Sequence, residues 1–397
     1  MSAGPGGAAS VIAGYARTPF TRSPGALGAV PATALGTCAI TAALQRAGIA
    51  PDEVDHVVGG QVLQAGAGQN PVRRSAVGAG VPLTAPALTL NAVCLSGVEA
   101  VVQAHRLIAA GEAEVVVAVG QESMTLAPHA WAGSRTGTRF GPVELLDTVQ
   151  HDGLTDAFEG TSMGLATDTS CAALGIDRAG QDEWAAESHR RAAASAALLA
   201  EEVVPVDVPG RRGSTTVTAD DGVRPDTTPE GLARLRPAFR PDGTITAGNS
   251  SQITDGAAAV VLVSARHAER TGRTGLAEVV AHALVAGPDT TLHAQPANAA
   301  ARALQRAGAG AHDLAAVEIN EAFAAVAVHS TRLLGVDPAI VNPHGGAIAL
   351  GHPIGASGAR VTGHLALRLH RLGAGALGVA ALCGGGGQGS AVVLRGR

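Results

Sequence analysis

The stretch Asn91-Ala92-Val93-Cys94-Leu95-Ser96-Gly97 is the part of the sequence around which the rest is organised. Through residues 98–109, apolar side chains then recur at the spacing of a helix with one buried face. Cys94 therefore lies at or just before a helix start, where free N–H groups and the helix dipole favour an anion. Such a position predicts a lowered thiol pKa and a nucleophilic thiolate. A small buried hydrophobic residue is the alternative that this stretch leaves open.

The composition favours a layered α/β protein. Of the 397 residues, 46% are hydrophobic but only 2% are aromatic. A core of this kind consists of Ala, Val, Leu and Ile interleaved with glycine, which suits βα units with closely packed backbones. The length predicts more than one domain or subdomain.

Charge and cysteine content argue against several partners and settings. The formal net charge of −5 gives no reason to expect nucleic acid or a membrane surface as a partner. The cysteines at positions 38, 94, 171 and 383 lack metal-ligand spacing, which predicts a reducing compartment rather than a disulfide framework. Residues 1–10 lack the pattern of a signal peptide, and no window approaches the roughly 18 apolar residues of a membrane span. We therefore expect a cytoplasmic protein.

Two regions with buried strands flank a long irregular segment. Strands are expected at residues 11–15, 54–58, 113–120 and 257–264. A helix is expected at 32–47, and the glycine-rich run 59–68 is expected to be a loop. Residues 123–249 carry more charge, proline and glycine, with one polar helix at 178–199, and this predicts an insertion carried on a core.

The sequence contains an internal repeat. The hexamer Ala-Leu-Gln-Arg-Ala-Gly at 43–48 recurs at 303–308, and an acidic linker and a short apolar strand follow each copy. Ser96-Gly97 and Ser357-Gly358 each open a predicted helix that leads to a strand. These elements keep their register across an offset of about 260 residues, which predicts a duplication. The two helix starts should face one another across a pseudo-two-fold axis, and there we expect the chemistry.

The second half supplies a histidine that can act with Cys94. His352 lies in the glycine-rich stretch 342–358, which the repeat matches to the Cys94 loop. Cysteine near histidine is an arrangement that activates a nucleophile. A structural loop histidine is the alternative for His352, and His344 is interpreted as structural.

Two further stretches complete the set. Cys383 precedes four consecutive glycines, whose N–H groups can point at a developing oxyanion. Cys383 is then a candidate second acid/base, or an ordinary cysteine at a strand end. Asn320 directly follows an apolar strand and could hold a water or a carbonyl oxygen. Cys38 and Cys171 are interpreted as structural.

These stretches resemble the active-site blocks of the thiolases. The matching blocks are Asn91–Gly97, Asn320–Phe323, Gly345–Gly358 and Cys383–Gly389, supported by residues 16–20, 61–66, 68–71, 122–124 and 246–249. The resemblance covers nearly the whole chain from Val11. It implies a thiolase-type αβαβα fold of two similar halves, residues 1–272 and 273–397, with a loop subdomain at about 123–249 inserted in the first half.

The resemblance implies an acyltransferase that works through an acyl-enzyme. Cys94 would take the acyl group from acyl-CoA, and Cys383 would remove an α-proton from a second acetyl-CoA, whose carbanion attacks the thioester. The reverse reaction is thiolysis of a 3-ketoacyl-CoA. His352 would activate Cys94 and, with a water held by Asn320, stabilise the enolate oxygen. The N–H groups of Cys94 and Gly385 would form the other oxyanion hole.

The resemblance also implies the partners. Acyl-CoA and CoA would be substrates, without a separate cofactor or metal ion. The CoA and acyl contacts carried over are Leu154, Met163, Arg224, Ser251, Ala322 and Phe323. Arg224 suits a CoA phosphate, and a solvated surface arginine is the alternative. A homo-oligomer, a dimer of dimers, is implied as well, with a surface strand region expected at 75–90.

Departures from the family pattern leave the acyl chain length and the affinity for CoA open. They are Leu95, Ser162, Gly231, His344 and residues 293–296. Ser162 stands where short-chain biosynthetic members carry histidine. A longer-chain degradative 3-ketoacyl-CoA thiolase is therefore one alternative. A ketoacyl synthase would need histidine in place of Asn320, and retention of all four catalytic groups argues against a non-catalytic acyl-CoA-binding protein.

Overall fold

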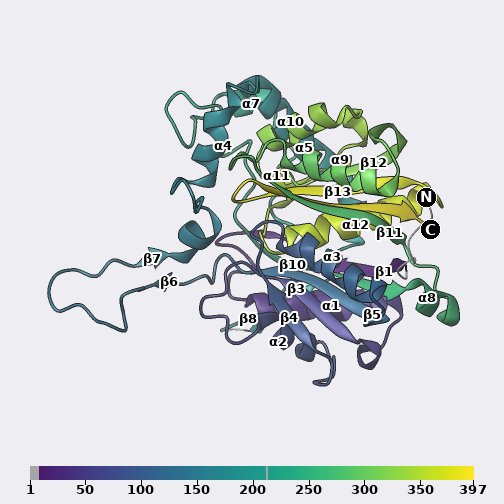
Figure 1. The fold of residues 1–397 in the computed structure, drawn as a ribbon. Coiled ribbons are helices and arrows are strands. Elements are labelled where there is room, and N and C mark those ends of the chain that lie inside the picture. Colours follow the sequence, from purple (N-terminus) through teal and green to yellow (C-terminus); the bar gives the residue numbers. More distant parts are fainter. Residues whose placement is uncertain (1–8, 212) are drawn as a thin grey trace.

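The computed structural model describes residues 9–211 and 213–397 (Figure 1). The prediction that residues 1–10 are no signal peptide falls almost wholly outside the described residues. The helices are α1 (Ala32–Ala47), α2 (Pro71–Gly78), α3 (Ser96–Ala109), α4 (Met163–Cys171), α5 (Arg178–Ala194), α6 (Ala196–Ala200), α7 (Pro229–Ala233), α8 (Ala265–Thr271), α9 (Gln295–Ala307), α10 (Ala324–Leu334), α11 (Ala347–Leu350) and α12 (Ser357–Leu372). Four single turns of other helix types are η1 (Pro51–Glu53), η2 (Val149–Gly153), η3 (Ala311–Asp313) and η4 (Pro338–Ile340).

The main strands form two sets with the same internal order. The first set runs β4 (Ala87–Leu90), β3 (His56–Gly60), β5 (Val115–Glu122), β10 (Thr254–Ser264) and β1 (Ser10–Arg17). The second runs β12 (Leu314–Ile319), β13 (Leu377–Gly384), β14 (Gln388–Gly396) and β11 (Ala277–Ala286). In both sets the first pairings are parallel and the later ones antiparallel. This shared topology confirms the predicted duplication.

Smaller strands complete the fold, and the two sets meet at one edge. The smaller strands are β2 (Thr21–Arg22), β6 (His129–Ala130), β7 (Leu146–Asp147), β8 (Val206–Gly210) and β9 (Gly213–Val217). The sets join where Ser10–Ile12 of β1 pairs with β11. The counterpart of β4 in the second half is reduced to a single parallel bridge, between Val317 and Val341.

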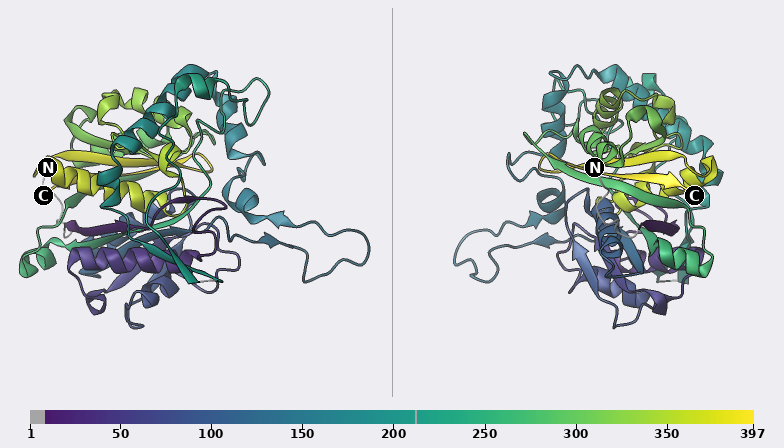
Figure 2. Two further views of the ribbon diagram at one scale, coloured as in Figure 1. Left: turned by 180° about the vertical axis from the view of Figure 1, so that it is seen from behind. Right: turned by 45° about the vertical axis from the view of Figure 1, so that its right-hand side comes forward.

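Helices lie outside each strand set and between the two sets (Figures 1 and 2). Alternate residues of β10 pack in opposite directions: Val261 joins the core under α1, and Val260 and Leu262 join the core around α3 and α12. Because both faces are covered, the strand is apolar throughout rather than alternating with polar residues. A third core forms under α9 on the second set. The predicted αβαβα layering is confirmed.

The two central helices touch through glycine. A Cβ atom added to Gly97 at the start of α3 would lie 2.6 Å from the backbone nitrogen of Ala359. One added to Gly358 at the start of α12 would lie 2.1 Å from the backbone nitrogen of Val98. Neither position has room for a side chain. The duplicated helix starts therefore meet backbone to backbone, as the repeat predicts.

Two local predictions were wrong, and a third, the polar helix, is confirmed except for one break. Gly59 and Gly60 belong to β3 rather than to a loop. A Cβ atom on Gly60 would lie 2.5 Å from the carbonyl carbon of Ser96, so the start of α3 packs directly on this strand. These glycines therefore serve close packing. The polar helix expected at 178–199 is interrupted at Ser195 and forms α5 and α6. The expected surface strand at 75–90 is mostly the end of α2 and a turn, with only β4 extended.

The segment inserted between β5 and β10 has two parts. Residues 126–147 form a long arm with the short hairpin β6–β7, which projects from the body (Figures 1 and 2). Farther along, α5 packs on the second half, where Trp184 and Ser188 both donate hydrogen bonds to the buried carboxylate of Glu321. Across the described residues, no helix is both long and apolar enough to cross a membrane. The division of the halves at residue 272 stays a prediction.

Candidate active site

Cys94 lies in a tight turn directly before α3. The N–H of Leu95 donates to the carbonyl of Ala92, and the Ser96 hydroxyl donates to the carbonyl of Val93 at 2.6 Å. Val93 is held at φ = 53°, which is unfavourable for a β-branched residue and costs about 1–3 kcal/mol. Such strain persists only where surrounding contacts fix it, and it gathers at functional sites. Sequence reasoning did not single out Val93, because local composition does not reveal a dihedral angle.

The surroundings of the Cys94 thiol oppose ionisation. Its sulfur packs among apolar side chains, which are Val62, Leu63, Met124 and Ile354. Burial raises the pKa of Cys94 to about 12, although the N–H groups of Cys94 and Gly385 point at the sulfur and act in the opposite direction. The predicted lowering of this pKa was therefore wrong. The helix starts two residues later, at Ser96, so its dipole does not outweigh desolvation. A neutral thiol needs a base at the moment of attack.

His352 has the properties of that base. Its Nδ1 lies 2.6 Å from the Ser357 hydroxyl oxygen, which lies 3.0 Å from the carbonyl oxygen of Pro353. A carbonyl only accepts, so the Ser357 proton goes to Pro353, and Nδ1–H donates to Ser357. This leaves Nε2 unprotonated, with a lone pair that can accept a proton. Burial, helped by the positive charge of Arg360, lowers the pKa of His352 to about 4, so the ring is neutral at physiological pH.

Asn320 lies beside His352, and Cys383 lies near Cys94. Asn320 is fully buried after β12, with its Nδ2 3.5 Å from both ring nitrogens of His352. Its Oδ1 has no hydrogen-bond partner among the described residues, which is unusual for a buried amide. Cys383 is fully buried at the end of β13. Burial raises the pKa of the Cys383 thiol, and the proximity of Cys94 raises it further.

The structure thus brings the four predicted groups together. Gly385 directs its N–H at Cys94, the two cysteines are close enough to affect each other's pKa, and Asn320 lies beside His352. Ile354, two residues after His352, packs against Cys94. Among the described residues, no hydrogen bond joins His352 to Cys94 directly. Activation of Cys94 by His352 therefore stays a prediction.

Most of the predicted CoA contacts gather around one cavity. It has a volume of about 550 Å³, and four of them line it: Leu154, Met163, Ser251 and Phe323. Ser162 also lines the cavity, and its hydroxyl caps α4 by accepting from the N–H of Leu165. Ala322 lies instead in the buried cluster around Cys383. Arg224 is exposed and does not line the cavity.

A second cavity lies on the other side of Met163. It has a volume of about 630 Å³ and is lined by Val93 and Gly385 beside the nucleophile and by Phe158 and Ala286 farther out. Met163 borders both cavities. Among the described residues, no group of three or more His, Cys, Asp or Glu side chains could hold a metal ion.

Two protein-family models match the sequence. The model of the thiolase N-terminal domain matches residues 10–266, and that of the thiolase C-terminal domain matches residues 273–396. The chain belongs to the thiolase family. It is 53% identical over 388 residues to a protein of Mycolicibacterium smegmatis named "Probable acetyl-CoA acetyltransferase", covering 97% of this chain and all of that one. Acetyl-CoA acetyltransferases of Chromobacterium violaceum and Cupriavidus necator are 46% and 45% identical, covering 95% and 97% of this thiolase and 97% and 98% of their own lengths.

The stability of this thiolase should depend on pH through His352. The folded chain holds this ring with a pKa of about 4, against about 6.5 when unfolded, so the unfolded chain binds the proton first as the pH falls. The contribution of the neutral ring is complete above pH 6.5 and decreases by about 2 kcal/mol between pH 6.5 and pH 5. Urea unfolding across this range should show a steeper loss for the wild type than for His352→Asn. Parallel losses in the two proteins would contradict this assignment.

Proposed function

We propose that this thiolase is an acetyl-CoA C-acetyltransferase, which condenses two acetyl-CoA molecules to acetoacetyl-CoA and CoA and catalyses the reverse thiolysis. The observation that carries the proposal is the convergence of Cys94, the Gly385 N–H, His352 and Cys383 from the two halves. The names of the three relatives support the same activity.

In the first half-reaction, Cys94 becomes acetylated. Its proton moves to Nε2 of His352 as the sulfur attacks the thioester carbonyl, whose oxygen is stabilised by the N–H groups of Cys94 and Gly385. When the bond to CoA breaks, the Cys383 thiol protonates the departing CoA thiolate. The acetyl-enzyme then carries a Cys383 thiolate and a protonated His352. Both charges are buried, so they stabilise each other.

In the second half-reaction, the new carbon–carbon bond forms. The Cys383 thiolate removes the α-proton of the second acetyl-CoA, and its elevated pKa makes it a strong base. Protonated His352 and a water held by Asn320 stabilise the enolate oxygen. The carbanion attacks the acetyl group on Cys94, and the released sulfur takes the proton of His352. All three groups return to their starting protonation states.

Packing around Cys383 supports small acyl groups. Its side chain is enclosed by Leu292, Ala322 and Val326, with Met163 and Phe323 against the same cluster. A longer-chain degradative thiolase remains the second candidate, because the cavity bordered by Gly385 and Phe158 offers space beyond Met163 for a longer acyl chain. Thiolysis assays across chain lengths separate the two.

We expect acetoacetyl-CoA to be cleaved more efficiently than longer substrates. The side chains clustered around Cys383 enclose it closely, so a longer tail would have to extend into the second cavity, which Met163 borders. The comparison is kcat/KM for thiolysis of acetoacetyl-CoA and of an eight-carbon 3-ketoacyl-CoA. A higher value for the eight-carbon substrate would favour the degradative candidate.

The two catalytic cysteines should fail in different ways. Cys94→Ala removes the covalent acceptor, so neither acetyl-enzyme nor turnover should be detected. Cys383→Ala keeps the acceptor and His352, so acetyl-CoA should still acetylate Cys94, although more slowly, because the departing CoA thiolate loses its proton donor. Condensation should fall by the roughly 10²–10⁴-fold that a positioned acid/base typically contributes. Mass spectrometry after digestion places the acetyl group. Acetyl on Cys383 in the wild type, or an active Cys94→Ala variant, would overturn the roles; Cys38→Ala serves as the control.

We also propose binding of acyl-CoA and CoA in a cytoplasmic setting, without nucleic acid. Arg224 is exposed and available to a CoA phosphate, and its backbone N–H is held by His189 at 3.1 Å. All four cysteines are free thiols, which supports a reducing compartment.

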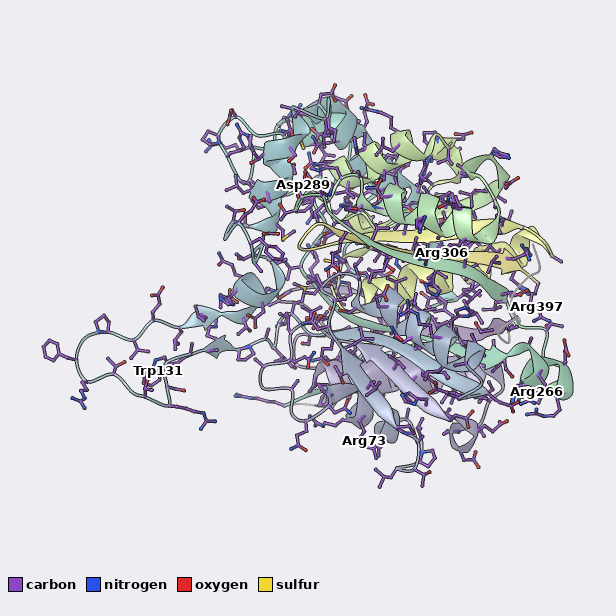
Figure 3. The ribbon with its side chains drawn as sticks, viewed as in Figure 1. Arg73, Trp131, Arg266, Asp289, Arg306 and Arg397 are labelled. Carbon is purple, nitrogen blue, oxygen red and sulfur yellow. The ribbon has the colours of Figure 1, made fainter. Side chains whose placement is uncertain are left out.

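We further propose a homo-oligomer, a dimer of dimers. The projecting arm exposes large apolar side chains, with Phe140 98% exposed and Leu145 54% exposed, and Trp131 lies on the same arm (Figure 3). The edge strand β4 exposes Leu88 as well. Exposed apolar side chains and a free strand edge are both surfaces that partner subunits cover.

The arm and the β4 edge should contribute separate interfaces. Light scattering of the wild type should give about four times the 39.2 kDa chain mass, and replacing residues 133–143 by a short Gly-Ser turn should halve it. Phe158→Ser, at an exposed apolar residue outside the arm, is the control and should leave the mass unchanged. A species of single-chain mass at micromolar concentration would refute the proposal.

A further inference from the structure

One buried carboxylate connects the loops around both Cys94 and His352. Glu122, the last residue of β5, has no exposed surface. Its Oε2 accepts the backbone N–H groups of Val62 at 3.0 Å and Gly355 at 2.9 Å, and its Oε1 accepts that of Leu63 at 3.1 Å. Three backbone donors thus converge on a single side chain.

The three donors belong to opposite halves of the molecule. Val62 and Leu63 follow β3 in the first half, and both side chains pack against Cys94. Gly355 lies in the second half, three residues after His352, and its neighbour Ile354 packs in the same cluster with Cys94. Glu122 therefore binds backbone N–H groups from both halves of the molecule, next to side chains of the cluster that contains Cys94.

The backbone around this carboxylate is closely packed. A Cβ atom on Gly355 would lie 2.7 Å from Oε2 of Glu122, and one on Gly120 would lie 2.5 Å from the carbonyl oxygen of Gly355. A small displacement of Glu122 must therefore move the backbone that carries His352. The three donors suit a carboxylate, because an amide in its place would oppose an N–H group with its own NH₂.

We propose that Glu122 is a positioning residue for the thiolase reaction: its carboxylate holds the 62–63 loop and the Gly355 loop together and thereby sets the distance between Cys94 and His352. The proposal rests on the proposed function, since it concerns transfer of the Cys94 proton to His352. Glu122 itself touches neither substrate nor a reacting atom. Its effect should appear in turnover rather than in CoA binding, because neither Glu122 nor its three N–H donors line the cavity that contains Ser251 and Phe323.

The test compares two isosteric substitutions of buried carboxylates. Glu122→Gln keeps the shape but loses one acceptor. Asp255→Asn is the matched control: Asp255 is also fully buried, on the neighbouring strand β10, and its carboxylate accepts from the N–H and hydroxyl of Thr125 but from none of the three N–H groups that Glu122 binds. Thermal unfolding of both variants measures how much folding stability each loses when its buried carboxylate is replaced by an amide.

For Glu122→Gln we expect kcat of acetoacetyl-CoA thiolysis to fall about 10²-fold, the cost of misplacing reacting groups by about 1 Å, with KM for CoA within about twofold. Asp255→Asn should keep kcat within about threefold at a similar loss of thermal stability. The rate of Cys94 acetylation, followed by mass spectrometry, should fall in parallel with kcat. If Glu122→Gln does not fold, Glu122→Asp, which keeps the charge but shortens the reach, is judged by the same kcat and KM criterion.

The outcomes separate this inference from the proposed function. A wild type without thiolase activity would refute the proposed function. An active wild type with fully active Glu122→Gln, or with kcat reduced equally in Asp255→Asn, would overturn the role of Glu122 alone. A rise in KM for CoA without a loss of kcat would overturn it too, since it would place Glu122 with the binding groups.

Discussion

The backbone contact between α3 and α12 is the constraint on which the rest of this thiolase depends. Gly97 and Gly358 let the two helices touch where each begins, and a methyl group at either position would collide with the other backbone. Cys94 precedes one helix start and His352 precedes the other. The contact therefore brings two residues separated by more than half of the chain to one place. Two neighbouring strands of the second set, β12 and β13, then supply Asn320 and Cys383 at their ends.

Desolvation governs the chemistry at this place. It keeps the Cys94 and Cys383 thiols protonated and the His352 ring neutral in the resting enzyme. A resting site without charges avoids the large cost of burying an ion. In the proposed reaction, charge appears only when substrate is bound, and the N–H groups and His352 would stabilise it without first moving into position. The strained backbone of Val93 and the Oδ1 of Asn320, which has no hydrogen-bond partner in the described part of the chain, belong to the same site. Each costs folding free energy, which is typical of functional sites.

The inserted segment couples the catalytic core to its surroundings. Its α4 and the loop before it form walls of both cavities, so Met163 separates the two spaces open to an acyl group. Its α5 anchors Glu321 through Trp184 and Ser188, and Glu321 in turn binds the N–H of Ile348, ahead of His352. The insertion is thus part of the frame that holds the His352 loop. The base of its arm reaches the site, since Ala127 packs in the cluster that contains Cys94 and Asp147 lines the first cavity, whereas Phe140 farther along the arm is 98% exposed.

The sequence by itself determined the duplication and the layered fold, and it predicted the four groups that the structure brings together at one site. A repeated hexamer, apolar runs without alternation and glycine at two helix starts are local patterns, which can be recognised from the order of the residues alone. It did not determine the ionisation of Cys94, since the dipole was visible from the sequence and the apolar wall of Val62, Leu63 and Ile354 was not. Nor did it reveal Ser357 or Glu122 as supports of the site. Hydrogen bonds from Val62, Leu63 and Gly355 to Glu122 join residues 59 to 233 positions apart, and only the packed tertiary structure places such groups within 3.1 Å of one another.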